Sequence, residues 1–256
     1  MNIKWNSEEY KENFSFVHEY GEDVLKLLEI NKNSRVIDLG CGNGVLTNKL
    51  SGICDNVIGI DASEDMLKTA KETYPYLNFI KGDALSFNSE EKADAVFSNA
   101  VFHWIDKDKQ SELLANINHN LNSDGQLVCE FGGSGCAETI HSGLEYEFNK
   151  RNLVYPRTFF FPTIGEYTPI MENNGFKVVF AVLFDRKTKL NGQDGLRNWI
   201  NMFVTEPFKN IDNSTANEII TSTVNNLKPV LSENGIWYAD YVRIRLKAIK
   251  VKEIKG

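Results

Sequence analysis

Short apolar runs alternate with amphipathic segments through the first half of this chain. Between the runs, apolar residues recur at helical spacing, as in Met66, Leu67 and Ala70 and again from Leu113 to Leu121. Nearly continuous apolar strands separated by helices predict a parallel sheet covered on both faces, and right-handed crossovers make it a doubly wound α/β sheet. The runs that we expect to be strands are 35–39, 56–60, 78–80, 94–98 and 126–131.

The second half of the chain is less regular. Two β-rich segments, 176–184 and 237–251, bracket residues 185–234, in which apolar positions again follow helical spacing. We expect this piece to be a helical insertion between the last two strands, too small for a core of its own and therefore packed across the edge of the sheet. The chain is then a single domain with a mostly parallel, seven-stranded sheet and a helical cap.

Composition and charge narrow the class of protein. With 256 residues, 42% of them hydrophobic and 25% charged, the chain has the make-up of a folded globular protein. A net charge of −7 without a basic stripe argues against a nucleic-acid partner. The longest charge-free apolar stretches, 95–105 and 178–184, are too short to span a membrane, and the first residues lack the apolar core of a secretory signal. We therefore expect a cytoplasmic protein with no membrane partner.

Cysteine and histidine spacing gives no sign of a metal site. The four cysteines contain no CxxC pair, and no His-rich cluster has the spacing of a zinc site. We predict free thiols and no bound metal. Three histidines, which have no partner pattern and are expected at the surface, are His18, His119 and His141.

The strongest candidate for chemistry directly follows the first predicted strand, where the sequence reads Asp38-Leu39-Gly40-Cys41-Gly42-Asn43-Gly44. In open α/β sheets, ligands bind at the carboxyl ends of the strands, and the first turn contacts the cofactor. A dinucleotide site requires the pattern GxGxxG, but Val45 stands where the third glycine belongs. The carboxylate of Asp38 would repel a pyrophosphate and attract an ammonium group. The turn therefore favours a cofactor with a positive charge and disfavours a nicotinamide dehydrogenase.

Two further carboxylates follow the next two predicted strands. Asp61 ends the second strand, where a carboxylate can accept hydrogen bonds from both hydroxyls of a ribose. Asp83 follows the third strand, where it could accept from the exocyclic amine of a purine. Each residue alone is a common turn or helix-cap residue. Three acids at three successive strand ends together predict a nucleoside site.

These segments resemble the successive motifs of class I S-adenosylmethionine-dependent methyltransferases. The resemblance covers about residues 30–135 and rests on the turn from Asp38 to Gly44, Gly59-Ile60-Asp61-Ala62-Ser63 with Met66, Gly82-Asp83-Ala84, and Asp94-Ala95-Val96-Phe97-Ser98-Asn99. It implies a Rossmann-like fold and S-adenosyl-L-methionine as the cofactor. The cofactor-binding residues that it implies are Trp5, Tyr10, Phe14, Asp38, Gly40, Cys41, Gly42, Asp61, Ala62, Met66, Asp83, Ala84, Asn99, Ala100 and His103. The implied contacts are methionine for Gly40, Gly42, Asn99 and Ala100, ribose for Asp61, and adenine for Met66, Asp83 and Ala84.

A narrower likeness extends into the second half of the chain. The segments 99–104, 131–135, 161–167 and 237–241 are similar to the branch of the family that includes trans-aconitate methyltransferase. The opening Trp5-Asn6-Ser7-Glu8-Glu9-Tyr10 resembles the start of that branch, whose aromatic segment folds over the cofactor. The division of the single domain that we predict is an amino-terminal helical lid (1–30), a cofactor-binding core (31–184), a helical cap (185–235) and a last strand (236–256).

Methyl transfer from a sulfonium is an in-line displacement that requires alignment and exclusion of water, so we expect a lidded pocket. His103, close behind the fourth strand, is the catalytic candidate: it takes a proton or, if the acceptor is a carboxylate, only positions it. The guanidinium forks available for a carboxylate are Arg157, Arg243 and Arg245, of which the last two share a face of the final strand. The candidates for contact with the substrate are Trp104, Arg157, Trp199, Phe203, Tyr238 and Tyr241.

Two classes of function stay open at this point. The first is methyl transfer from S-adenosylmethionine to a small-molecule acceptor through a carboxylate or hydroxyl oxygen. The second is a protein that binds S-adenosylmethionine or S-adenosylhomocysteine without transferring the methyl group. Either class is compatible with a monomer or a homodimer. For Trp199 and Phe203, the alternative to a place in the lid is ordinary helix core.

Overall fold

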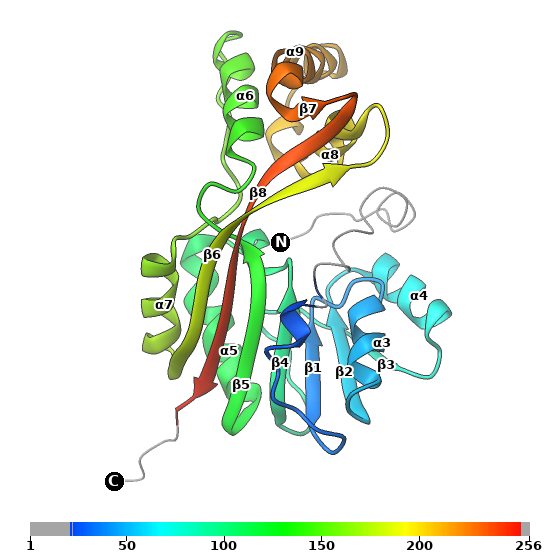
Figure 1. Cartoon of the computed structure of the whole chain (residues 1–256), viewed down its shortest axis with the longest axis vertical. Helices are drawn as coiled ribbons and strands as arrows, with labels where there is room; N and C mark the ends of the chain where they lie inside the picture. Colours follow the sequence, from blue (N-terminus) through cyan, green and yellow to red (C-terminus); the bar gives the residue numbers. More distant parts are fainter. Residues whose placement is uncertain (1–20, 22, 252–256) are drawn as a thin grey trace.

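The computed structural model describes residue 21 and residues 23–251. Its centre is a sheet with the strand order β3-β2-β1-β4-β5-β8-β6, and the short strand β7 pairs with β8 (Figure 1). Strands β1 to β5 are parallel to one another. Strand β8 lies between β5 and β6 and is antiparallel to both. The predicted doubly wound, mostly parallel sheet is thus confirmed. The strands are β1 (Arg35–Leu39), β2 (Asn56–Asp61), β3 (Asn78–Lys81), β4 (Ala93–Asn99), β5 (Leu121–Gly132), β6 (Phe176–Leu190), β7 (Ser232–Glu233) and β8 (Ile236–Lys250).

Helices form the connections, and several of them begin at a side-chain cap. Ser63 accepts a hydrogen bond from the Met66 amide at the start of α4, and Thr163 forms a capping box with Glu166 at the start of α7. Such caps fix the point at which the chain leaves each loop and enters the helix. The helices are α3 (Val45–Ser51), α4 (Glu64–Thr73), α5 (Gln110–Asn120), α6 (Glu138–Asn149), α7 (Ile164–Asn173), α8 (Gly195–Phe203) and α9 (Asn213–Leu231).

The two faces of the sheet bury separate hydrophobic clusters. On one face, side chains of α5 and α7, such as Leu114 and Tyr167, pack on β5 residues that include Phe131. On the other face, Leu50 of α3 packs against Phe97 of β4. Burial on both faces explains why the parallel strands read as continuous apolar runs in the sequence.

The strand order reverses between β1 and β4. The chain proceeds from β1 outward to β2 and β3, then returns to β4 on the opposite side of β1 and proceeds to β5. At such a switch point the connections leave the carboxyl ends of the two strands in opposite directions, which opens a crevice above the sheet. The candidate site described below lies there.

The helical cap differs from the sequence-based expectation. Strands β6 and β8 continue beyond the other strands and carry α6, α8 and α9 at their far end (Figure 1). These helices enclose a third hydrophobic cluster, which includes Phe148 of α6, Ile200 of α8, Ile219 of α9 and Trp237 of β8. The predicted insertion, residues 185–234, therefore supplies only part of this cluster. The rest comes from α6, which lies earlier in the chain than the predicted cap, and from β8.

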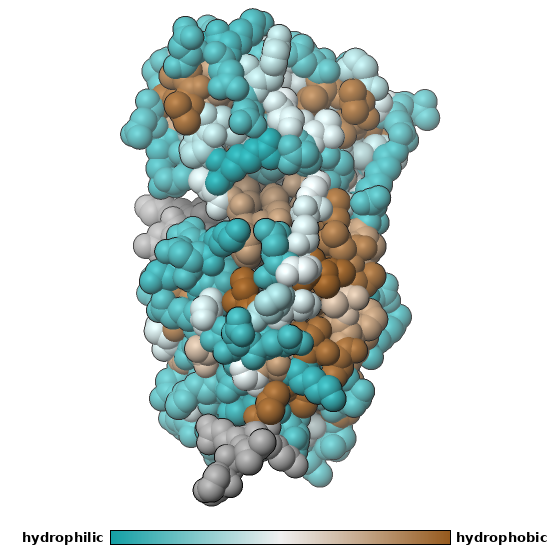
Figure 2. Space-filling model, turned by 90° about the vertical axis from the view of Figure 1, so that its left-hand side faces the viewer, coloured by the Kyte–Doolittle hydropathy of each residue, from teal (hydrophilic) through white to brown (hydrophobic). Residues whose placement is uncertain are grey.

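Strand β6 lies at the end of the sheet, opposite β3. Figure 2 looks toward this side and shows hydrophobic side chains gathered at mid-height, most of them in the right half of the view. Val179 and Phe180 of β6 are exposed. None of the helices in the described part of the chain has the length and hydropathy needed to cross a membrane.

Candidate functional site

A cavity of about 520 Å³ opens at the carboxyl ends of β1 to β4, at the switch point of the sheet. The predicted nucleoside-binding residues from Asp38 to Ala100 all line it, although they come from four different strand ends. Trp5, Tyr10 and Phe14 lie outside the described residues. The predicted residues that the structure brings together are Asp38, Gly40, Cys41, Gly42, Asp61, Ala62, Met66, Asp83, Ala84, Asn99 and Ala100.

The backbone of the turn after β1 has room for small residues only. Gly40 and Gly44 both have a positive φ, of 76° and 82°. A side chain at Gly40 would collide with Val101, which follows β4. The turn therefore packs closely against the loop after β4, while Gly42 has open space where a side chain would be. This leaves the backbone of the turn accessible to a ligand in the cavity.

Asp38 is a buried acid at the base of the turn. Its side chain is 2% exposed and accepts a hydrogen bond of 2.6 Å from the hydroxyl of Thr47. Burial raises the pKa of Asp38 from 3.8 to about 7, and the neighbouring charge of Asp61 contributes in the same direction. A group with a positive charge in the cavity would relieve this penalty, which agrees with the charge preference inferred from the sequence.

Asp61 connects the ends of β1 and β2. One carboxylate oxygen accepts from the Gly42 amide at 2.8 Å, and the other accepts from the Ser63 amide at 2.8 Å. Burial raises the pKa of Asp61, although these amides oppose the shift. The remaining lone pairs of a carboxylate held in this way can accept from hydroxyls in the cavity. Asp83, in contrast, is exposed at the rim and accepts from the Leu85 amide at 2.9 Å.

His103 lies just beyond the cavity, in the short turn after β4. Its ring is 7% exposed, and its Nδ1 atom accepts a hydrogen bond of 3.2 Å from the Gly132 amide. Because Nδ1 is the acceptor, the ring proton of the neutral imidazole is on Nε2. Burial lowers the pKa of His103 well below its ordinary value, and the charge of Arg243 lowers it further. His103 can therefore donate a hydrogen bond through Nε2, and its lowered pKa makes it a weak proton acceptor.

An aromatic cluster joins the cavity to the cap. Trp104 lines the cavity, and its ring centroid lies 4.8 Å from that of Phe159 and 6.0 Å from that of Phe203. Phe203 in turn contacts Trp199, whose indole nitrogen donates to the Tyr241 hydroxyl at 2.5 Å. Four of the predicted substrate residues therefore lie in one place. We call this group, with its further members, the acceptor cluster: His103, Trp104, His141, Phe159, Phe161, Trp199, Phe203, Tyr241 and Arg243.

Comparison with known proteins identifies the family. Residues 36–125 match the family described as methyltransferase domain. The chain is also 32% identical to an uncharacterized methyltransferase of Schizosaccharomyces pombe, over 96% of this chain and 98% of that protein. The chain belongs to the methyltransferase family.

Other similarities agree with this assignment. An uncharacterized methyltransferase of Bacillus cereus is 32% identical over 68% of this methyltransferase and 82% of its own length. A crystal structure of a putative methyltransferase from Bacillus halodurans has a TM-score of 0.64 at 17% identity, covering 90% of this chain and 98% of that one. The structural likeness shows the fold. The narrower likeness to the trans-aconitate branch stays a prediction.

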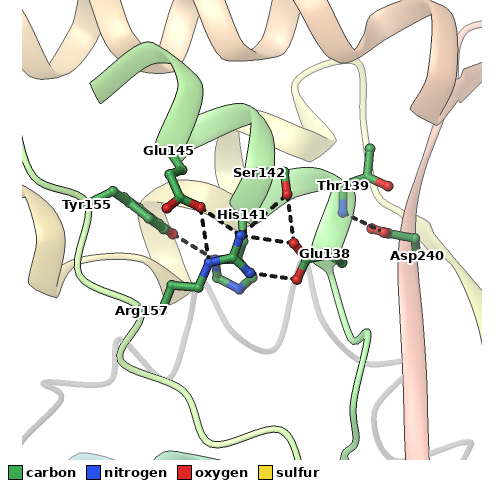
Figure 3. Close-up of polar contacts among 8 residues, drawn as sticks. All are labelled: Glu138, Thr139, His141, Ser142, Glu145, Tyr155, Arg157 and Asp240. Atoms are coloured by element: carbon green, nitrogen blue, oxygen red, sulfur yellow. Dashed lines mark hydrogen bonds and ion pairs between the residues drawn. The ribbon is translucent and has the colours of Figure 1, made fainter. Parts of the chain in front are cut away.

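The remaining two substrate candidates of the methyltransferase lie elsewhere. Arg157 is held between two carboxylates of α6, with nitrogen–oxygen distances of 2.6 Å to Glu138 and 2.8 Å to Glu145 (Figure 3). Its charge is therefore already balanced. Tyr238 lies under the ammonium of Lys187, 4.4 Å from its ring centroid, and side-chain alternation along β8 places it on the opposite face from Tyr241.

His141 was missed by the sequence analysis, which expected it at the surface. The side chain is 3% exposed, and its Nδ1 atom is 2.7 Å from the Tyr155 hydroxyl (Figure 3). Burial lowers the pKa of His141 to about 4. The helical stripe of Ile140, Leu144 and Phe148 in α6 is visible in the sequence and could have indicated that this helix is buried. His119, as expected, is exposed.

Proposed function

We propose that this methyltransferase transfers the methyl group of S-adenosylmethionine to an oxygen atom of a small-molecule acceptor. One observation carries the proposal: three carboxylates from three successive strand ends, Asp38, Asp61 and Asp83, line a single cavity beside an open glycine turn. When bound, S-adenosylmethionine supplies a methyl group activated by a positively charged sulfur. The residues fit such a ligand, because a buried acid such as Asp38 is stabilised by a cation and not by a pyrophosphate.

The donor half of the site would hold the cofactor as follows. Asp38 and the turn face its positively charged part, Asp61 accepts from the ribose hydroxyls, and Asp83 lies at the rim for the adenine. Met66, which lines the same cavity and is 4% exposed, offers an apolar surface for the base. Asn99 and Ala100 complete the wall next to Trp104, on the side of the acceptor cluster.

The choice of oxygen follows from the state of His103. A hydroxyl must lose a proton during methyl transfer, whereas a carboxylate already carries the electron pair that attacks. His103 already has its ring proton on Nε2 and uses Nδ1 to accept from Gly132. It can orient an acceptor oxygen by donating to it, which supports a carboxylate. The aromatic rings around it would exclude water from the reacting atoms.

Cofactor binding and transfer test this proposal separately. We expect calorimetry to show binding of S-adenosylmethionine and no binding of NAD. Asp61→Asn should weaken S-adenosylmethionine binding by about 10- to 100-fold, since hydrogen bonds to a charged group contribute about 1.5–3 kcal/mol. Asp185→Asn, on the exposed surface of β6, is the matched control. We also expect the protein to transfer a labelled methyl group from S-adenosylmethionine to acids in a metabolite extract.

Each step has an outcome that contradicts it. Equal affinity for S-adenosylmethionine in wild type and Asp61→Asn would refute the role given to Asp61. Binding without transfer to any compound of the extract would favour a non-catalytic binding protein. Transfer to amines alone would refute the oxygen acceptor while leaving the cofactor assignment intact.

A further inference from the structure

Arg243 stands out because its charge is buried and no acid of the described residues pairs with it. Its side chain is 8% exposed, and its Nε atom has no hydrogen-bond partner among residue 21 and residues 23–251. Within the described residues, no carboxylate lies within ion-pair distance of its guanidinium. A buried charge without a partner costs free energy, so a protein retains one only where something compensates it.

Two acids on the same part of the sheet form no ion pair with Arg243. Glu130, directly across from Arg245 in the register of β5 and β8, pairs with both Arg245 and Arg186, at 2.7 Å and 2.6 Å. Asp240 is three residues before Arg243 and therefore on the opposite face of β8. There its Oδ2 atom accepts from the Thr139 amide, while its Oδ1 atom has no hydrogen-bond partner among the described residues. Arg243 thus adds a positive charge that the described residues do not neutralise.

The position of Arg243 connects it with the acceptor cluster. In the sheet it lies opposite Gly132, the residue whose amide donates to His103. Its guanidinium carbon is 4.5 Å from the centroid of the Tyr241 ring, and the Tyr241 hydroxyl accepts from Trp199. Arg243 therefore lies between the turn that holds His103 and the base of the cap.

A second unpartnered group lies in the same cluster. The Nε2 atom of His141 is buried and has no hydrogen-bond partner in the part of the chain that the structure describes, although its Nδ1 atom contacts Tyr155. Its ring is surrounded by Phe159, Phe161 and Trp199, at centroid distances of 5.4, 6.1 and 6.0 Å. Aromatic walls with two unsatisfied polar groups are typical of a site that binds a small polar ligand.

We infer that Arg243 is the specificity-determining residue for an anionic methyl acceptor, whose carboxylate it binds in the acceptor cluster. The inference rests on the proposed function, because it deepens the nature of the acceptor. A guanidinium offers two parallel N–H donors to a carboxylate, and this geometry separates an acid from the amide of the same shape. His141 and His103 are neutral there, so Arg243 provides the charge recognition.

The test compares binding of matched acids and amides. The probes are straight-chain monocarboxylic and dicarboxylic acids of four to eight carbons and their primary amides, titrated into the protein with saturating S-adenosylhomocysteine. We expect at least one acid to bind about 10-fold or more tightly than its amide, and Arg243→Gln to remove this preference. Arg243→Lys should restore part of it, because the charge returns without the fork.

Controls distinguish recognition from structure. Arg197 of α8 is half-buried and donates to Thr221, and the variant Arg197→Gln should bind the acids as wild type does. Arg243→Gln should keep its affinity for S-adenosylhomocysteine and should not lose thermal stability. If Arg243→Gln loses stability and cofactor affinity together, the residue is structural and the inference is wrong.

The remaining outcomes separate this inference from the proposed function. If acids bind through Arg243 but no methyl is transferred to them, the anion site stands and the proposed reaction fails. If acids are methylated equally by wild type and Arg243→Gln, the reaction stands and the inference fails. If no probe binds to the wild type, the inference is overturned.

Discussion

The buried carboxyl of Asp38 leads to a prediction about the pH dependence of stability. In the folded protein burial raises the pKa of Asp38 to about 7, whereas the ordinary value is 3.8. At about 1.4 kcal/mol per pKa unit, ionising this group in the fold costs at most about 4 kcal/mol. Between these two pKa values the folded chain keeps a proton that the unfolded chain has lost. The stability contributed by this group is therefore full at low pH and falls as the pH rises toward about 7.

The substitution Asp38→Asn removes this titration but keeps the shape of the side chain. Relative to wild type, the variant should gain about 2–3 kcal/mol in unfolding free energy between about pH 5 and about pH 8. The comparison across pH cancels the intrinsic difference between Asp and Asn, such as the changed bond to Thr47. Urea unfolding without cofactor at a series of pH values measures it, with Asp185→Asn as an exposed control.

The same substitution should also change the proton release that accompanies cofactor binding. A cation in the cavity stabilises the ionised Asp38, so binding of S-adenosylmethionine below about pH 7 should release a proton from wild type and not from Asp38→Asn. Calorimetry in buffers of different ionisation enthalpy measures the difference between the two proteins. A stability advantage of Asp38→Asn that is constant or shrinks as the pH rises would refute the reasoning. So would identical proton release by the two proteins.

Two further predictions concern the neighbouring groups. Glu130→Gln should destabilise the fold by about 3–5 kcal/mol, because it leaves two arginines in a buried place without their shared carboxylate. Urea unfolding checks it against Glu233→Gln, which breaks an exposed ion pair and should cost less than about 1 kcal/mol. For methyl transfer, kcat should show no histidine titration between about pH 6 and about pH 9, because burial keeps His103 neutral. His103→Gln, whose amide oxygen can accept from Gly132, should retain more activity than His103→Phe. If kcat of the wild type instead falls at acidic pH and both variants lose this dependence, His103 acts as a base.

The cavity of the candidate site could be predicted from the sequence because its signals are local. Each of its residues sits at the end of a strand that is recognisable from its apolar run, and parallel strands bring such ends to one edge of the sheet. The spacing of Asp38, Asp61 and Asp83 along the chain was therefore enough to place them in one cavity. The closing segment with Trp5 and Tyr10 lies outside the described residues and stays a prediction.

The acceptor half depends on contacts between distant segments. Periodicity correctly placed Arg243 and Arg245 on one face, yet it gave no information about which of them pairs with Glu130. That choice is made by the register of β5 against β8, which puts Glu130 opposite Arg245 and a glycine opposite Arg243. The burial of His141 likewise arises only when α6 joins helices that come more than forty residues later.

The cavity and the acceptor cluster come from largely different segments of the chain. The cavity is built from turns after β1 to β4. The acceptor cluster takes His103 and Trp104 from the turn after β4, and its other members come from β8, the loop before α7 and the cap helices. The cap has a hydrophobic cluster of its own, separate from those of the sheet. Substitutions in that cluster can therefore change the shape of the acceptor site without disturbing the packing that holds the cofactor residues. Trp104, which belongs to both the cavity wall and the cluster, is the point at which the two halves have to match.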